Sequence, residues 1–244
     1  MTLSKTCTQS LTSSSSSVTT AQAHCSPWLT SLVYPLGCDL VLPSYFDRIT
    51  ITGQEHLPKT GPVLLAPTHR SRWDALLVPY ATGRRATGRD LRFMVTASEM
   101  GGIQGWFIRR LGGFSVNVDR PSIASLRLGV ELLQQGNMLV IFPEGGIFRD
   151  GDVHPLRPGL ARLALQAEAS QPNLGVQIVP ISLNYQPLIP RWGCQVDIHI
   201  GRSLKVENYR QGSTKHDAQR LTNDLKSSLL RLEQSTQPRE RVLV

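Results

Sequence analysis

Apolar and polar positions alternate along most of this chain in short runs that predict strands and helices in turn. Runs typical of buried strands occur at 63–66, 91–96, 114–118, 138–142, 176–183 and 196–200. Helical patterns are expected from Ser71, at 104–111, from 121–122 to about 135, and at 158–169 and 215–234. Strands that alternate with helices predict an α/β domain whose central, largely parallel sheet is flanked by helices. We expect this single domain at 47–236, followed by a tail at 237–244.

The first 26 residues have a different composition. They are rich in Ser and Thr, lack Asp and Glu, and include the serine block 13–17. Such a segment cannot bury enough apolar surface to order itself, so a disordered tail at 1–26 is predicted. A plastid-type transit peptide, which is also Ser-rich and acid-poor, is the alternative. The tail is favoured because Lys5 is the only Lys or Arg in the segment.

The next segment, 27–46, is apolar but is interrupted by Asp39 and two prolines. Crossing a bilayer takes about 18 or more apolar residues in a row, so a membrane span is not expected. The segment could lie in the membrane interface, with Trp28 and Tyr34 at headgroup level. Equally, it could pack on the core of the domain.

Composition narrows the class of partner. The chain has 244 residues, 40% hydrophobic and 18% charged, as in an ordinary globular protein. Its net charge of +8 favours anionic partners. Because the basic residues are dispersed and not interleaved with aromatics, an anionic membrane surface or a phosphorylated substrate is expected rather than nucleic acid. The four cysteines show no C-x-x-C spacing, so neither a metal site nor a disulfide framework is expected, and a reducing compartment is favoured.

Candidate chemistry begins at His69 and Asp74, which read H-x-x-x-x-D after the strand-like run 63–66. A neutral imidazole can take a proton from an alcohol near pH 7, and a carboxylate can orient the ring. On one continuous helix the two side chains would be about 140° apart, so His69 is expected in a loop and Asp74 in the first helical turn. Alternatively, Asp74 merely caps the helix in an S-x-x-D box with Ser71.

A second stretch, 112–120, reads G-G-F-S-V-N-V-D-R. Its strand would deliver Arg120 to an exposed end, where a guanidinium can hold a phosphate through two hydrogen bonds. Arg109 and Arg110 could add positive charge. The alternative is a surface ion pair between Arg120 and Asp119.

A third stretch, 142–149, places Glu144 after a buried strand and before Gly145 and Gly146. The glycines would let the backbone approach a ligand closely, and Glu144 could accept a hydrogen bond from a hydroxyl group. The alternative is a glycine turn with a solvated carboxylate.

These stretches together resemble the glycerolipid acyltransferase family, which includes the 1-acylglycerol-3-phosphate acyltransferases. H-x-x-x-x-D at 69–74, G-F-S-V-N-V-D-R at 113–120, F-P-E-G at 142–145 and V-P-I-S-L at 179–183 stand in that family's order and spacing. The resemblance covers about 47–205. It implies transfer of a fatty acyl group from acyl-CoA or acyl-carrier protein to a glycerolipid hydroxyl. The acceptor implied first of all is 1-acylglycerol 3-phosphate, and the product is then phosphatidate.

The resemblance also implies roles for individual residues. His69 would be the general base and Asp74 its orienting partner. Arg120 would hold the acceptor phosphate, and the implied substrate-binding positions are Gly113, Phe114, Arg120, Glu144 and Gly145. Neither a metal nor an organic cofactor is implied, because the thioester is already activated.

Two departures from the family pattern concern the acceptor phosphate. Many lysophosphatidate-specific members read F-P-E-G-T-R-S, whereas Ile147 stands here in place of the arginine and Arg149 lies two residues further on. Many also carry a lysine near 96–99, and this chain has none there. Lysophosphatidate remains the leading acceptor, with another lysophospholipid or glycerol 3-phosphate as the alternative. Arg109, Arg110 and Arg149 could compensate.

A catalytically silent protein that binds anionic lipid is the alternative of a different class, and a hydrolase is a third. The intact pair of His69 and Asp74 argues against the silent protein, and the lack of a G-x-S-x-G elbow argues against the hydrolase. Because its substrates would be lipids, we expect a peripheral or monotopic membrane protein on the cytoplasmic face. Its net positive charge and the segment 27–46 would bind it to the membrane.

Overall fold

The computed structural model describes residues 35–96, 102, 112–116 and 123–235. The predicted tails at 1–26 and 237–244, the predicted helix at 104–111, and Arg109, Arg110 and Arg120 lie outside these residues. The structure therefore does not test the expectations for them.

The described strands form one mixed sheet in which most neighbours run parallel. In the order β1-β7-β6-β2-β5-β3-β4, every neighbouring pair is parallel except β6 with β7, and β8 also pairs antiparallel with β6. This confirms the predicted fold class. The strands are β1 (Phe46–Thr52), β2 (Val63–Pro67), β3 (Leu91–Thr96), β4 (Gly113–Val116), β5 (Met138–Val140), β6 (Gln177–Gln186), β7 (Cys194–Ile200) and β8 (Leu204–Lys205).

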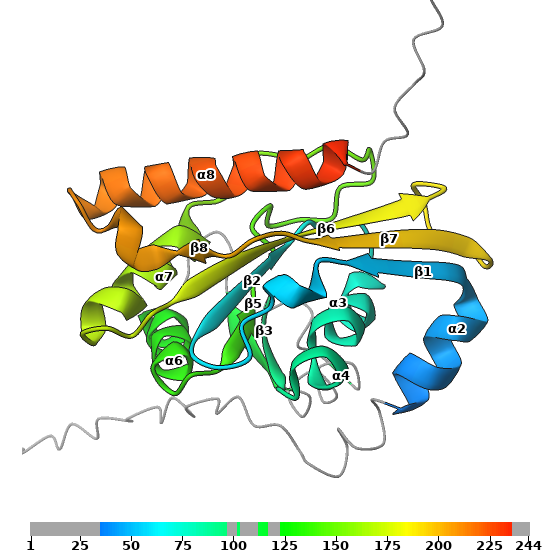
Figure 1. The fold of residues 1–244 in the computed structure, drawn as a ribbon, viewed down its shortest axis with the longest axis horizontal. Helices are drawn as coiled ribbons and strands as arrows, with labels where there is room; N and C mark the ends of the chain where they lie inside the picture. Colours follow the sequence, from blue (N-terminus) through cyan, green and yellow to red (C-terminus); the bar gives the residue numbers. More distant parts are fainter. Residues whose placement is uncertain (1–34, 97–101, 103–111, 117–122, 236–244) are drawn as a thin grey trace, which may run out of the picture.

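Helices cover both faces of the sheet (Figure 1). One apolar cluster joins the sheet to α6, α7 and α8, and the other joins it to α2 and α3. The α-helices are α2 (Leu42–Tyr45), α3 (Asp74–Thr82), α4 (Arg84–Thr87), α6 (Ile123–Gln134), α7 (Gly159–Ser170) and α8 (Thr214–Gln234). Short turns of other helix types are η1 (Leu36–Val41), η2 (Gln54–His56) and η4 (Val206–Tyr209).

Strand β2 shows why the sequence folds in this way. All five of its residues are buried, as expected for a parallel strand with helices on both sides. Because side chains alternate along a strand, Leu64 and Ala66 enter the cluster under α6, α7 and α8, whereas Val63 and Leu65 enter the other. The continuous apolar run at 63–66 thus serves two cores at once.

The described part of the apolar segment 27–46 packs on the core and also reaches solvent. Cys38 and Leu42 are buried, whereas Leu36 is 50% exposed and Leu40 is 60% exposed. The expectation that this segment lies in a membrane interface stays a prediction. Among the described helices, none is long and apolar enough to cross a membrane.

The topology brings the chemistry-bearing loops to one edge. Strands β2, β3, β4, β5 and β6 run parallel, so their carboxyl ends lie at the same edge of the sheet, where open α/β sheets bind their ligands. His69 comes two residues after β2 ends, and Glu144 comes four residues after β5 ends. The fold therefore places them as neighbours.

Candidate active site

His69 and Asp74 meet at the start of α3. His69 lies in the loop after β2, Asp74 is the first residue of the helix, and 2.8 Å separates His69 Nδ1 from Asp74 Oδ2. This is the arrangement that their spacing predicts. Thr68 fixes this loop to β6: its N–H donates to the Ile181 carbonyl, and its Oγ1 accepts from the Leu183 N–H.

Asp74 is completely buried, and donors surround its carboxylate. Oδ2 also accepts the N–H groups of Arg70 and Ser71 at 2.7 and 2.9 Å. The Ser71 contact is the backbone half of a capping box, although the helix begins at Asp74 rather than at Ser71 as predicted. The two readings of Asp74 are therefore compatible, since one carboxylate closes the helix start and contacts the imidazole.

Tyr185 supplies the donor on the other oxygen. Its hydroxyl reaches across from β6 and donates to Asp74 Oδ1 at 2.5 Å. Burial and the negative charge of Asp74 both raise the pKa of Tyr185 above its usual range, so the hydroxyl keeps its proton. Sequence reasoning missed Tyr185, because 111 residues separate it from Asp74 and no motif connects the two.

This geometry suits His69 to accept a proton at Nε2. With Nδ1 hydrogen-bonded to a carboxylate, the neutral ring carries its proton on Nδ1 and leaves the Nε2 lone pair available. The ring stacks on Phe142 with 3.9 Å between centroids. Its side chain is 19% exposed, so a hydroxyl group from solvent can reach it.

Glu144 contacts the backbone of His69 rather than facing solvent. Its side chain is fully buried, and Oε2 accepts the His69 N–H at 2.8 Å. Oε1 accepts the His154 N–H at 3.0 Å, and Arg70 Nη1 bonds both oxygens. The predicted contact between Glu144 and an acceptor hydroxyl stays a prediction, and here the carboxylate has other partners.

Arg70 joins this loop to the C-terminal helix. Its side chain is 3% exposed, and Nη2 donates to the Asp152 carbonyl and to Glu233 Oε1 in the last turn of α8. Burial lowers the pKa of Arg70, but the charges of Glu144 and Glu233 outweigh it, so the net pKa is raised. Sequence reasoning singled out neither Arg70 nor Glu233, whose contact spans 163 residues.

Gly145 is required by its backbone conformation. Its φ is +74°, and a Cβ there would lie 2.5 Å from Arg157 Nε. Its N–H donates to the Phe142 carbonyl, while the N–H of Phe148 donates to the His69 carbonyl at 2.9 Å. The tight turn therefore brings Phe148 back to the His69 carbonyl, so the loop bonds the backbone of His69 at its carbonyl as well as at its N–H.

The other predicted substrate-binding positions lie on β4. Gly113 is buried, and Phe114 is 1% exposed and packs in the core cluster under α6, α7 and α8. Their substrate contacts stay predictions, as does the phosphate contact of Arg120. Ile147 is 37% exposed, and the nearby Arg149 is exposed.

Within the described ranges, no group of three or more His, Cys, Asp or Glu side chains is placed to hold a metal ion. The expectation that the reaction needs no cofactor stays a prediction.

Comparison with known proteins identifies the family of this chain. The family model described as Acyltransferase matches residues 48–184, and the chain belongs to this family. The resemblance found in the sequence motifs is thereby confirmed.

Relatives with assigned names fall into two groups. The chain is 24% identical to a 1-acyl-sn-glycerol-3-phosphate acyltransferase of Streptococcus pneumoniae over 182 residues, which are 71% of this chain and 61% of that protein. It is 30% identical to a glycerol-3-phosphate acyltransferase of Alteromonas mediterranea over 132 residues, or 51% of this chain and 16% of that protein. The matched part thus spans less than two thirds of either relative.

The fold also matches a solved structure. The 1-acyl-sn-glycerophosphate acyltransferase PlsC from Thermotoga maritima superposes with a TM-score of 0.63, covering 84% of this chain and 80% of that one. At 20% sequence identity, this likeness shows the shared fold alone.

Proposed function

We propose that this protein is an O-acyltransferase that moves a fatty acyl group from a thioester to a glycerolipid hydroxyl. The observation that carries the proposal is the 2.8 Å contact between His69 Nδ1 and Asp74 Oδ2 in a chain of the Acyltransferase family. It stands at the sheet edge where such folds bind ligands.

In the proposed reaction, His69 Nε2 takes the proton of the acceptor hydroxyl as its oxygen attacks the thioester carbonyl carbon. The tetrahedral intermediate then expels the thiolate, the C–S bond breaks, and the imidazolium returns a proton to the sulfur. Asp74 stabilises the imidazolium between these two steps. No acyl-enzyme, metal or organic cofactor is required, because the thioester is already activated.

We propose 1-acylglycerol 3-phosphate as the leading acceptor, with another lysophospholipid or glycerol 3-phosphate as the alternative. Names of both kinds of acyltransferase among the relatives support a phosphate-bearing acceptor. The apolar Ile147 takes the place of a cation in the F-P-E-G loop, so Arg120 and Arg149 are the proposed phosphate ligands. The donor is acyl-CoA or acyl-carrier protein.

We further propose that the protein works as a peripheral or monotopic protein at an anionic membrane surface. A lipid acceptor and a lipid product require the site to open close to a bilayer. We propose the cytoplasmic face, because the four cysteines of the sequence lack the spacing of a disulfide framework.

The test is a panel assay of lysophosphatidate, glycerol 3-phosphate and other lysolipids with both thioester carriers. We expect His69→Ala to lower the rate about a thousandfold, because general base catalysis contributes about that much. His216→Ala, an exposed histidine on α8, is the matched control and should keep the wild-type rate.

Other outcomes would contradict the proposal in distinct ways. Wild-type rates in folded His69→Ala would remove the base assignment. Release of free fatty acid without an acylated acceptor would indicate a hydrolase. Lipid binding without thiol release from any thioester would indicate a silent lipid-binding protein.

A further inference from the structure

The turn between β6 and β7 projects beyond the end of β2. The last β2 pair is Pro67 with Ile181, yet β6 continues to Gln186 with β7 as its partner. Five further residues at about 3.3 Å each place the tip roughly 15 Å past the end of β2. Because β6 runs parallel to β2, the turn lies at the edge that carries His69. Figure 1 shows the long β6–β7 pair.

The tip of this turn exposes large apolar side chains to solvent. Leu188 is 50% exposed, Ile189 is 63% exposed and Trp192 is 73% exposed. A single exposed apolar residue is ordinary, but three within five positions indicate an interaction surface.

The turn contacts the N-terminal helical segment through Tyr45. The Gly193 N–H donates to the Tyr45 carbonyl at 2.8 Å, the Tyr45 hydroxyl donates to the Pro190 carbonyl at 3.3 Å, and the rings of Tyr45 and Trp192 lie 5.7 Å apart. Just before α2, η1 exposes two leucines. We call the combined surface the edge patch, which consists of Leu36, Leu40, Leu188, Ile189 and Trp192.

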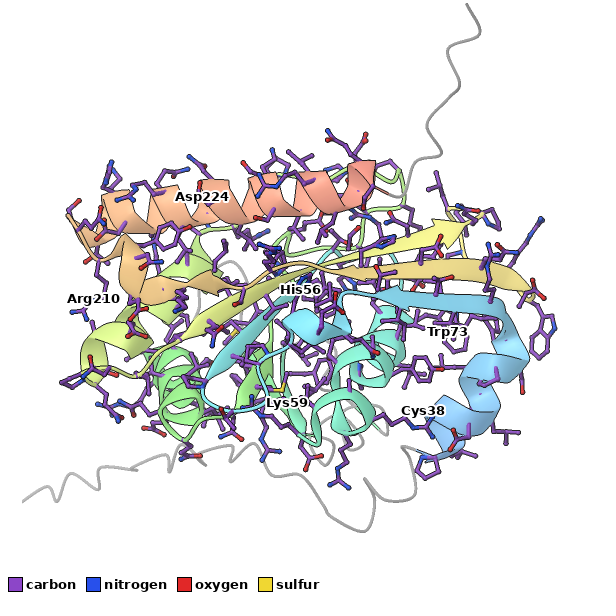
Figure 2. The ribbon with its side chains drawn as sticks, in the orientation of Figure 1. Cys38, His56, Lys59, Trp73, Arg210 and Asp224 are labelled. Carbon is purple, nitrogen blue, oxygen red and sulfur yellow. The ribbon has the colours of Figure 1, made fainter. Side chains whose placement is uncertain are left out.

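The edge patch borders the candidate site. The Trp73 ring packs on Tyr45 with 4.2 Å between centroids, and Trp73 directly precedes Asp74. Figure 2 shows Trp73 at the end of the molecule that carries α2. On another side, Leu188 Cδ2 would lie 3.2 Å from a Cβ built on Gly151, in the loop that follows Glu144.

The β6–β7 turn itself carries a basic residue that favours an anionic partner. Residues 187–193 contain Arg191 and no acidic residue. The exposed Asp39 of η1 is ion-paired with Arg85, and Asp47 and Arg48 at the start of β1 are adjacent opposite charges. Arg191 is therefore the charge directly beside the exposed tryptophan, while Asp150 and Asp152 stand in the loop that Leu188 contacts.

We propose that the edge patch inserts into the interface of an anionic lipid bilayer, with the β6–β7 turn as its leading element. Tryptophan is enriched at membrane interfaces, and a basic residue next to it is attracted to anionic headgroups. The proposal rests on the proposed function for its purpose, since a lipid acceptor would then reach His69 directly from the membrane. It extends membrane contact from the N-terminal segment to a turn about 150 residues later.

Flotation of the full chain with vesicles of phosphatidylcholine and phosphatidylglycerol tests the surface. We expect the triple variant Leu188→Ser, Ile189→Ser, Trp192→Ser to bind about tenfold or more weakly, because it removes most of the apolar area that would insert. The control is Leu230→Ser, which changes an apolar side chain of α8 that is 38% exposed and should bind like the wild type. Wild-type binding by the folded triple variant would overturn the proposal.

Quenching of tryptophan emission by lipids brominated on their acyl chains tests insertion directly. We expect Trp192→Phe to lose a smaller share of its emission on vesicle binding than the wild type does. If Trp192 stayed outside the bilayer, Trp192→Phe would lose a larger share of its emission than the wild type, and that result would contradict the proposal.

Activity measurements separate this inference from the proposed function. The triple variant should keep wild-type rates with a short-chain acceptor dissolved in water and lose activity with an acceptor embedded in vesicles. If the wild type acylates no acceptor, the proposed function fails, while the flotation result still decides the role of the patch. A wild-type dimer that the triple variant cannot form, with unchanged vesicle binding, would assign the patch to self-association and overturn the proposal.

Discussion

The two carboxylates beside His69 differ in how they act on it. Asp74 contacts the imidazole, whereas Glu144 contacts the backbone N–H of the same residue. Both are buried, so each needs several donors to offset the loss of water around its charge. Arg70 gives Glu144 its counter-charge. We infer that Glu144 is a positioning residue in this arrangement.

At the residue scale, Glu144→Gln distinguishes positioning from acceptor binding. The amide keeps one acceptor oxygen but presents an NH₂ group in place of the other, so it cannot accept from the N–H groups of both His69 and His154, and it gives Arg70 no counter-charge. We expect kcat to fall about a hundredfold while KM for the acceptor stays within about twofold. Breaking a buried ion pair should also cost about 3 kcal/mol of folding free energy, measured by urea unfolding.

A matched control is Glu207→Gln, which changes an exposed carboxylate to an amide and should leave both constants unchanged. A rise in KM with unchanged kcat would contradict positioning and would support the predicted contact between Glu144 and the acceptor.

Sequence reasoning reaches the residues of the site only where contacts are local or carried by a motif. His69 and Asp74 are five positions apart, so their spacing and helical geometry predict how they meet. Arg70 contacts Glu144 across 74 residues, and Tyr185 contacts Asp74 across 111. No periodicity connects such partners, because the order of strands in the sheet brings them together.

At the element scale, polar contacts hold α8 at its middle and at its last turn. Halfway along the helix, Asp224 accepts a hydrogen bond from Tyr209 of η4 at 2.8 Å, and Figure 2 shows Asp224 on this helix. At the last turn, Glu233 bonds Arg70. The apolar face of the helix buries Leu221, Leu225 and Leu229 in the core cluster shared with the sheet and α7. The helix thereby connects the far end of the domain to the catalytic loop.

The contact between Tyr209 and Asp224 predicts a loss of stability at alkaline pH. Burial and the bond to Asp224 raise the pKa of Tyr209 to about 12, whereas the unfolded chain has a tyrosine pKa of about 10. The stabilisation is therefore complete below pH 10 and is lost as the pH rises towards 12. Urea midpoints measured from pH 8 to pH 11.5 should fall more steeply in the wild type than in Tyr209→Phe.

Near pH 8, Tyr209→Phe should cost about 1 kcal/mol for the lost hydrogen bond. Comparison with the variant cancels the titration of lysines and of the other tyrosines. Parallel curves for the two proteins would show that Tyr209 titrates normally in the folded state.

The positions of the strands were easier to predict than which strands pair with each other. The run 91–96 matches β3 residue for residue, although it contains Arg92 and most of its described side chains are half-buried. The run 138–142 is longer than β5, which ends at Val140. The antiparallel pairing of β6 with β7 was not predicted individually, and neither was β1 beside β7, since pairing depends on contacts between distant segments.

At the scale of the whole molecule, the fold and the net charge together predict how the protein is oriented on a membrane. The strand edge that carries His69 also carries the edge patch, and the chain has a net charge of +8. Electrostatic attraction would bring the molecule to an anionic surface, and the apolar patch would decide which end contacts it. Added salt weakens the electrostatic attraction of the whole molecule to the membrane but not the apolar contact, so the two contributions to binding can be measured separately.

Binding of the full chain to vesicles with phosphatidylglycerol should weaken as sodium chloride is added, because salt screens the attraction. We expect Arg191→Gln to weaken that binding about fivefold at low salt, since one basic residue near the surface contributes about 1 kcal/mol. Arg210→Gln, at the opposite end of the molecule in Figure 2, should have a smaller effect.

On vesicles of phosphatidylcholine alone, Arg191→Gln should bind like the wild type. An equal loss for Arg191→Gln and Arg210→Gln would contradict the orientation, because it would mean that only total charge matters.

The direction of β6 has a practical consequence for anyone who labels or immobilises this protein. The turn at 187–193 lies at the edge of the sheet that carries His69, so a dye, affinity tag or sensor-surface linkage there would cover the apolar tip. The exposed residues Gln171, Pro172 and Asn173 precede the same strand at its other end. Attachment there would leave the catalytic edge pointing away from the support.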